Sequence, residues 1–157
     1  MLSSNSARCR RRPQDNQKFK TKSLKMTEGK DLNNFSITNT TSGKLPSLPF
    51  VSMKDAILGK KYELSVVFVS RDKIKKLNFI HRRKNKPTDI LSFPLSETSG
   101  EIFINLDEAK KEAKKFTREF ENFIGFLFIH GLVHLEGFDH GSRMGEREEK
   151  FRIKFGI

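Results

Sequence analysis

The segment His130-Gly-Leu-Val-His134-Leu-Glu-Gly137-Phe-Asp-His140 organises the fold expected of this chain, and it holds three of the four histidines in the sequence. A helix turns about 100° per residue, so His130 and His134 lie on one face, about one turn apart. Both imidazoles can then reach one metal ion. Gly137 can leave the helix in a left-handed conformation at no steric cost. The chain would then turn back and bring His140 to the same point.

Three neutral imidazoles leave a tetrahedral zinc ion with one open position for water, which is typical of a catalytic site. We therefore expect one Zn²⁺ per chain on a buried helix, although three histidines also bind nickel or copper. The alternative, two core histidines bonded to carbonyls, is disfavoured by the third histidine and the glycine at the right offsets. A structural zinc site would more often use cysteines, and the one cysteine is the distant Cys9.

Length and charge limit the possible classes of protein. A chain of 157 residues predicts one domain with a substantial core, rich in the 15 phenylalanines. The net charge is +12, which favours a polyanionic partner or, alternatively, a solubilising surface. One cysteine excludes an intrachain disulfide and fits a reducing compartment. No apolar run approaches the roughly 20 residues of a membrane helix, and we expect no secretory signal because the N-terminal residues contain no apolar stretch.

The basic charge is concentrated at the N-terminus. Residues 1–25 carry eight basic residues against one aspartate, a net charge of +7, and residues 26–157 carry 23 basic against 18 acidic residues. We predict that residues 1–25 are a disordered basic tail, or an upstream extension of a reading frame that starts at Met26. A mitochondrial transit peptide is disfavoured because apolar residues are too few. The folded domain is expected at 26–157.

Hydrophobic patterns predict a single α+β domain, with a mixed sheet of about four strands packed by helices. Strands are expected at 33–41, 61–70, 89–93 and 101–106. The strand at 61–70 is apolar on both faces and should be central. Pro94 is expected to stop the third strand, with a loop at 96–100. The last two strands could form a hairpin or could both pair with the central strand.

Five helices are expected between and after these strands. The first spans 48–58 and ends at Gly59. The second begins at Ser70 or Asp72 and reaches Arg83, with an inner stripe of Ile74, Leu77 and Ile80. Asp107 and Thr117 are plausible N-caps for the next two helices, and the last helix spans 142–155. The helix that carries His130 and His134 is apolar all round and should be buried.

The spacing His-x3-His-x2-Gly-x2-His resembles that of the metzincin zinc proteases. Those enzymes carry a glutamate directly after the first histidine, where it acts as general base. This chain has Gly131 at that position. Loss of the base would remove a contribution of about 10²–10⁴-fold to peptide hydrolysis. A peptide metallohydrolase is therefore an alternative with weak support.

A second resemblance accounts for that glycine. The segment 130–140 resembles the signature of the YbeY family, endoribonucleases and rRNA maturation factors, which reads His-Gly-x-x-His-Leu-x-Gly-Tyr/Phe-Asp-His. The stretch Asn78-Phe-Ile-His-Arg-Arg-Lys-Asn-Lys-Pro-Thr-Asp-Ile-Leu-Ser-Phe-Pro94 resembles the family's Asn-x-x-Tyr-Arg-x-Lys-x-x-Pro-Thr-Asp-Val-Leu-Ser-Phe-Pro. Gly100-Glu-Ile-Phe-Ile resembles its Gly-Asp-Ile strand. The resemblance covers roughly residues 33–157.

The resemblance implies a site and a function. His130, His134 and His140 would be the metal ligands, and Arg82 would match the family's functional arginine. His81 stands where the family has tyrosine, a change we expect to be tolerated. The implied activity is single-strand-specific cleavage of ribosomal RNA by a cytoplasmic endoribonuclease, at the 16S 3′ end and in ribosome quality control. The implied partner is the small ribosomal subunit, and the oligomeric state is left open.

The residues themselves fit this chemistry. Arg82 has a planar, permanently charged fork suited to phosphate oxygens, and the basic stretch 71–86 could track an RNA strand. Arg82 could instead be an ordinary cation at a helix end. Asp139 could orient a histidine or cap a turn, and nothing assigns a base role to Glu136. A third possibility is a non-catalytic RNA- or ribosome-binding factor stabilised by its metal.

Overall fold

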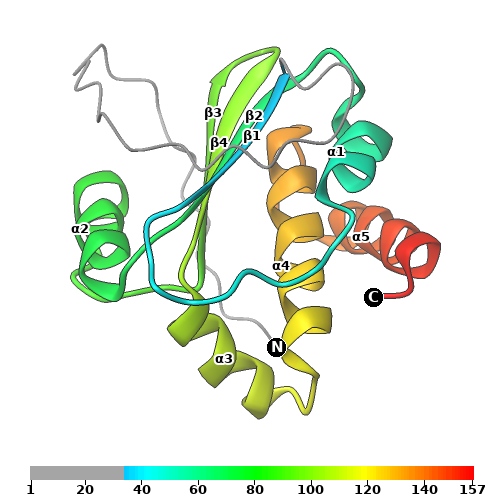
Figure 1. The fold of residues 1–157 in the computed structure, drawn as a ribbon. Helices are drawn as coiled ribbons and strands as arrows, with labels where there is room; N and C mark the ends of the chain where they lie inside the picture. Colours follow the sequence, from blue (N-terminus) through cyan, green and yellow to red (C-terminus); the bar gives the residue numbers. More distant parts are fainter. Residues whose placement is uncertain (1–33) are drawn as a thin grey trace.

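A computed structural model describes residues 34–157. Its centre is a four-stranded mixed sheet in the order β1-β2-β4-β3 (Figure 1). The central strand β2 (Glu63–Phe68) pairs in parallel with β1 (Phe35–Asn39) and with β4 (Ser99–Ile104). The edge strand β3 (Ile90–Ser96) runs antiparallel to β4. The predicted α+β class and mixed sheet are confirmed.

Helices cover both faces of the sheet, which explains why β2 is apolar on both sides (Figure 1). Leu64, Val66 and Phe68 are buried in the main core with α1 (Phe50–Leu58) and α4 (Phe120–Leu135). Val67 lies on the opposite face and packs in a smaller cluster with Ile74 of α2 (Arg71–Arg82). The helices α3 (Leu106–Lys115) and α5 (Ser142–Phe155) pack on α4.

The predicted buried helix is α4, and Gly131 is one of its points of contact with the sheet. A Cβ atom at this position would lie 2.8 Å from Ser92 Oγ, 3.0 Å from Ile90 Cδ1 and 3.1 Å from Ile102 Cδ1. Those atoms are the ends of side chains of β3 and β4, of which Ile102 is buried and Ser92 and Ile90 are partly buried, so they would have to shift to admit a methyl group. Glycine at 131 therefore lets α4 pack against the sheet without displacing these side chains.

Two predicted helix caps are wrong. The N-cap of α3 is the buried Asn105, whose Oδ1 accepts a hydrogen bond from Glu108 N at 2.8 Å, so Asp107 lies inside the first turn. The N-cap position of α4 is Glu119, and Thr117 instead has a positive φ of 54° in the preceding turn. Asn105 also donates from Nδ2 to Val69 O at 2.9 Å. A tertiary bond of this kind has no signature in the local sequence.

Two other local predictions, the end of the third strand and the inner stripe of the second helix, are corrected. Pro94 does not end β3, which continues to Ser96 after a register shift. An edge strand tolerates proline because one of its sides has no ladder to maintain. Residues 97–98 form a tight turn, and the hairpin alternative is confirmed, without pairing of β3 to β2. Ile80 is 51% exposed, because six residues of helix place it about 120° away from Ile74.

The predicted basic tail at 1–25 and the alternative start at Met26 lie outside the described residues, as does the first residue of the strand expected at 33–41. Within residues 34–157, every helix is too short or too polar to cross a lipid bilayer.

The contact at Gly131 predicts that adding a methyl group destabilises the protein at position 131 but not at position 145. Gly131→Ala should lower the free energy of unfolding by about 1–3 kcal/mol, because the methyl group overpacks the interface between α4 and the sheet. Gly145→Ala is the matched control. Its Cβ meets nothing within 4 Å, so a gain of about 0.5–1 kcal/mol is expected from helix propensity. Urea unfolding of both proteins in chelator measures the difference, and an unchanged Gly131→Ala protein would contradict this packing.

Candidate metal centre

The last turns of α4 place the first two histidines as predicted. His130 and His134 both lie in α4, which ends at Leu135. Gly137 follows with a φ of +107°, and Phe138 N donates back to Val133 O at 3.3 Å. The chain therefore turns sharply after the helix and returns His140 to the end of α4. The geometry expected from the glycine is confirmed.

The three imidazoles converge on one point. One ring nitrogen from each of His130, His134 and His140 lies within 4.8 Å of the other two. The rings of His134 and His140 are 4.6 Å apart between centroids, and those of His130 and His140 are 5.2 Å apart. These three residues could hold a metal ion.

Hydrogen bonds at the Nδ1 atoms of His130 and His134 leave the Nε2 atoms of both rings available to bind a cation. His134 Nδ1 lies 3.0 Å from Phe138 O and must donate, because a carbonyl oxygen only accepts. His130 Nδ1 lies 2.5 Å from Glu148 Oε1. Protonation at both Nδ1 atoms leaves a lone pair on each Nε2, and these two Nε2 atoms are 3.1 Å apart. Two nitrogens bound to a tetrahedral zinc ion at about 2.0–2.1 Å would lie about 3.3 Å apart. The residues fit this metal.

Glu148 is the site residue that sequence reasoning missed. It comes from α5, 18 residues after His130, and its side chain is 14% exposed. A carboxylate behind a ligating histidine fixes the ring orientation and tautomer and increases the basicity of the ligand. The acidic residues near 146–149 were visible in the sequence, but only the packing of α5 on α4 shows which one reaches the site.

Desolvation favours the neutral forms of His134 and His140, and metal binding requires neutral imidazoles. Desolvation, reinforced by the neighbouring His130 and His140, lowers the pKa of His134 to about 4. Desolvation and His130 also lower the pKa of His140. A histidine with a lowered pKa offers its lone pair at pH 7 without first releasing a proton.

Arg82 lies at the C-terminal end of α2, and its charge acts on the metal centre. The guanidinium is one of the causes that lower the pKa of His140. The fold thus brings together residues from the two distant sequence segments singled out above. The role of Arg82 stays a prediction. Its neighbour His81 packs on Phe93 with ring centroids 4.5 Å apart, so an aromatic ring serves at the position where tyrosine was expected.

Two further candidates are placed by their contacts. Glu136 accepts a hydrogen bond of 2.9 Å from Arg147 Nε and a second bond from the same guanidinium, which joins α5 to the end of α4. This contact gives Glu136 a structural role. Asp139 is among the charges that raise the pKa of His140, so it lies close to that ring. The orienting role of Asp139 stays a prediction.

Gly131 also decides between the two resemblances. The close neighbours of its missing Cβ are all residues of β3 and β4. A glutamate here would be directed into the sheet, with no space for its side chain. The general base of the metzincin pattern therefore has no place in this fold.

Comparison with known proteins yields one family. A family model described as Endoribonuclease YbeY matches residues 32–154. The Endoribonuclease YbeY of Aliarcobacter butzleri is 37% identical over 130 residues, covering 77% of this chain and 91% of the relative. That of Campylobacter jejuni (strain 81-176) is 39% identical over 106 residues, covering 64% and 78%. That of Acholeplasma laidlawii is 40% identical over 89 residues, and the match spans 54% of this chain and 65% of the relative.

A solved structure with a similar fold supports this comparison. The solution structure of a Thermotoga maritima protein matches with a TM-score of 0.53 and 29% sequence identity. The match covers 74% of this chain and 85% of that protein.

The contact between His130 and Glu148 predicts a loss of metal affinity without loss of fold. Glu148→Gln keeps the shape but removes the charge that favours the Nδ1–H tautomer, so zinc affinity should fall about 10–100-fold. Glu149→Gln, at the next and exposed position, should leave zinc affinity unchanged. Competition with a chromophoric chelator measures both constants. Equal affinities in the two variants would remove Glu148 from the site.

The lowered pKa of His134 predicts a pH-dependent stability of the metal-free protein. An unfolded histidine binds its proton near pH 6.5, but folded His134 does so near pH 4. Between these values the unfolded chain holds more protons, so stability falls as the pH falls. The contribution of His134 should be at most about 2 kcal/mol between pH 7 and pH 5, because solvent screens part of the effect on this partly buried ring. Urea unfolding at pH 7 and pH 5 should show a smaller decrease in the free energy of unfolding for His134→Gln than for the wild type. Equal decreases in the two proteins would refute the lowered pKa of His134.

Proposed function

This chain belongs to the YbeY family, whose relatives are named endoribonucleases, and on that premise we propose that it is a metal-dependent endoribonuclease that cleaves single-stranded ribosomal RNA. The observation that carries the proposal is the convergence of three histidine nitrogens within 4.8 Å, with the charge of Arg82 acting on the same site. This arrangement combines a place for a cation with a place for a phosphate.

In this proposal, His130, His134 and His140 hold one zinc ion per chain. A bound zinc ion would lower the pKa of a water molecule and polarise a phosphoryl oxygen. Glu148 and Phe138 O hold two of the rings with their Nε2 atoms toward the centre. Because α4 is buried, these rings are positioned before substrate arrives, and little reorganisation accompanies the reaction.

Arg82 binds the scissile phosphate in this proposal. Its guanidinium can donate two parallel hydrogen bonds to phosphate oxygens and keeps its charge at any physiological pH. The other cations of the 71–86 segment would bind the neighbouring backbone without regard to base sequence. They are Arg71, Lys73, Lys75, Lys76, Arg83, Lys84 and Lys86.

We place this activity in the maturation of the 3′ end of 16S ribosomal RNA and in ribosome quality control, on the small subunit and in the cytoplasm. The support is the family membership and a net charge of +12, which suits a partner rich in phosphate. Peptide hydrolysis is disfavoured, since position 131 has no space for the glutamate that such chemistry uses.

Variants of Arg82 and His134 should separate catalysis from metal binding. Arg82→Ala should lower kcat for a single-stranded RNA that carries the 16S 3′ end by about 10²–10³-fold, because one group that stabilises developing charge is lost. Its zinc content should stay near one equivalent. His134→Ala should lose both zinc and cleavage. The exposed Lys150 on α5 provides the control variant Lys150→Ala, which should behave as wild type.

The same measurements test the non-catalytic alternative. Zinc and RNA bound by the wild type, without cleavage by any variant, would show a metal-stabilised RNA-binding factor. Absence of zinc from the wild type after loading would overturn the assignment of the three histidines.

A further inference from the structure

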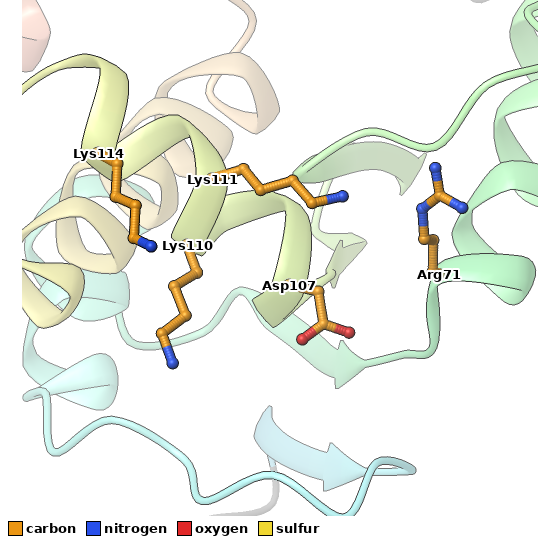
Figure 2. Close-up of a pocket in the computed structure, with 5 residues that line it drawn as sticks. All are labelled: Arg71, Asp107, Lys110, Lys111 and Lys114. Carbon is orange, nitrogen blue, oxygen red and sulfur yellow. The ribbon is translucent and has the colours of Figure 1, made fainter.

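A basic hollow lies away from the histidines, between the start of α2 and the exposed face of α3. Its volume is about 580 Å³, and Figure 2 shows the five residues that line it: Arg71, Asp107, Lys110, Lys111 and Lys114. Arg71 reaches toward α3 from the first turn of α2, and on α3 Lys110 and Lys111 are neighbours in the sequence while Lys114 lies about one turn further on.

The two walls of the hollow are joined by a buried side chain. Asn105 is 1% exposed and caps α3 through its Oδ1 atom, 2.8 Å from Glu108 N. Its Nδ2 donates to Val69 O at 2.9 Å, immediately before Ser70, the N-cap of α2. One residue thus sets the first turns of both helices relative to each other. The hollow exists before any ligand binds, so little ordering is needed on binding.

The charges in the hollow are arranged to receive an anion. Glu108 lies between Arg71 Nε, at 3.0 Å, and Lys111 Nζ, at 2.8 Å, and so holds both cations in place. Lys110 and Lys114 are one helical turn apart and therefore share a face of α3. With Asp107, four cations stand against two carboxylates, so the group has a net charge of +2. Both carboxylates lie in the first turn of α3, where they also stabilise the helix start.

The chemistry of the hollow favours a phosphate backbone. Lys110, Lys111 and Lys114 are exposed and can replace the counterions of successive phosphates. The chain's own first 25 residues carry a net charge of +7 and are not complementary to it. Arg71 and Arg82 stand at opposite ends of α2 and are separated by eleven residues, or about 16 Å along the helix axis. That distance corresponds to about five phosphates of a stacked strand, at about 3.4 Å each.

We propose that the hollow between α2 and α3 is a second RNA-binding site, which holds the phosphate backbone of the substrate strand about five nucleotides from the bond at the metal centre. This inference rests on the proposed function. It adds a requirement for strand length: RNA that spans both ends of α2 binds more tightly than RNA that reaches only the histidines.

The test compares a short and a long single strand on the full-length zinc-loaded protein. Lys110→Gln/Lys114→Gln should raise KM for a 12-nucleotide RNA about tenfold and leave its kcat unchanged. Both constants for a four-nucleotide RNA should stay at wild-type values. Lys60→Gln/Lys61→Gln, at exposed positions before β2, is the matched control and should have no effect. Fluorescence anisotropy in chelator should show a salt slope lower by about 1.4, for two phosphate contacts on a single strand.

A variant that is expected to tighten RNA binding tests whether misfolding explains the effect of the lysine substitutions. Asp107→Asn removes a negative charge from the hollow and should tighten binding of the 12-nucleotide strand about threefold. Unchanged or weaker binding of the 12-nucleotide strand by Asp107→Asn overturns the proposal. So does a Lys110→Gln/Lys114→Gln protein that binds both strands as tightly as Lys60→Gln/Lys61→Gln does. A labelled polyglutamate peptide serves as the competing probe. If the lysine substitutions weaken binding of this peptide but not of RNA, the proposal is overturned in favour of an acidic protein as the ligand.

The outcomes separate this inference from the proposed function. If the wild type cleaves RNA and Lys110→Gln/Lys114→Gln changes KM equally for the short and the long strand, the second RNA-binding site is refuted and the nuclease activity is not. Absence of cleavage in the wild type refutes the nuclease, and the anisotropy measurements still decide whether the hollow binds RNA.

Discussion

The contact of α4 with the sheet at Gly131 is the constraint on which the rest of this structure depends. The helix must approach β3 and β4 closely enough to leave no space for a methyl group, with Ser92 Oγ 2.8 Å from the missing Cβ. On the adjacent side of the same turn, His130 must face the metal centre. A helix separates neighbouring residues by about 100°, so His130 can face the metal centre while position 131 faces the sheet, where glycine avoids displacing the side chains of β3 and β4. Close packing therefore excludes a catalytic glutamate at 131 and also makes the histidines rigid.

The metal centre is a junction between three parts of the chain. His130 and His134 come from α4, His140 follows the turn at Gly137, and Glu148 comes from α5. A cation bound here would stabilise the contact of α5 with α4 as well as the turn. Stability and metal affinity should consequently be coupled through Glu148, because the ring that binds metal is also the ring that contacts α5.

Charge and metal are divided between opposite faces of the sheet. The histidines belong to the α4 side, whereas the basic helix α2 packs on the other face and brings Arg82 back toward the centre at its C-terminal end. At its N-terminal end, Arg71 meets α3 in the basic hollow. The two ends of α2 thus connect a rigid metal centre with a surface that recognises charge alone. Such a division suits an enzyme that must hold a flexible strand without reading its sequence.

The sequence by itself determined the family, the α+β class, the central strand and the three converging histidines. These features are carried by local patterns: helical spacing, a glycine with positive φ and an apolar run. Only the tertiary structure decided that Glu148 supports His130, that Asn105 bonds to Val69 O, and that β3 continues past Pro94. Glu148 is 18 residues from His130, and Asn105 is 36 residues from Val69. Contacts of this kind depend on how helices pack across a sheet, and no short stretch of sequence encodes that packing.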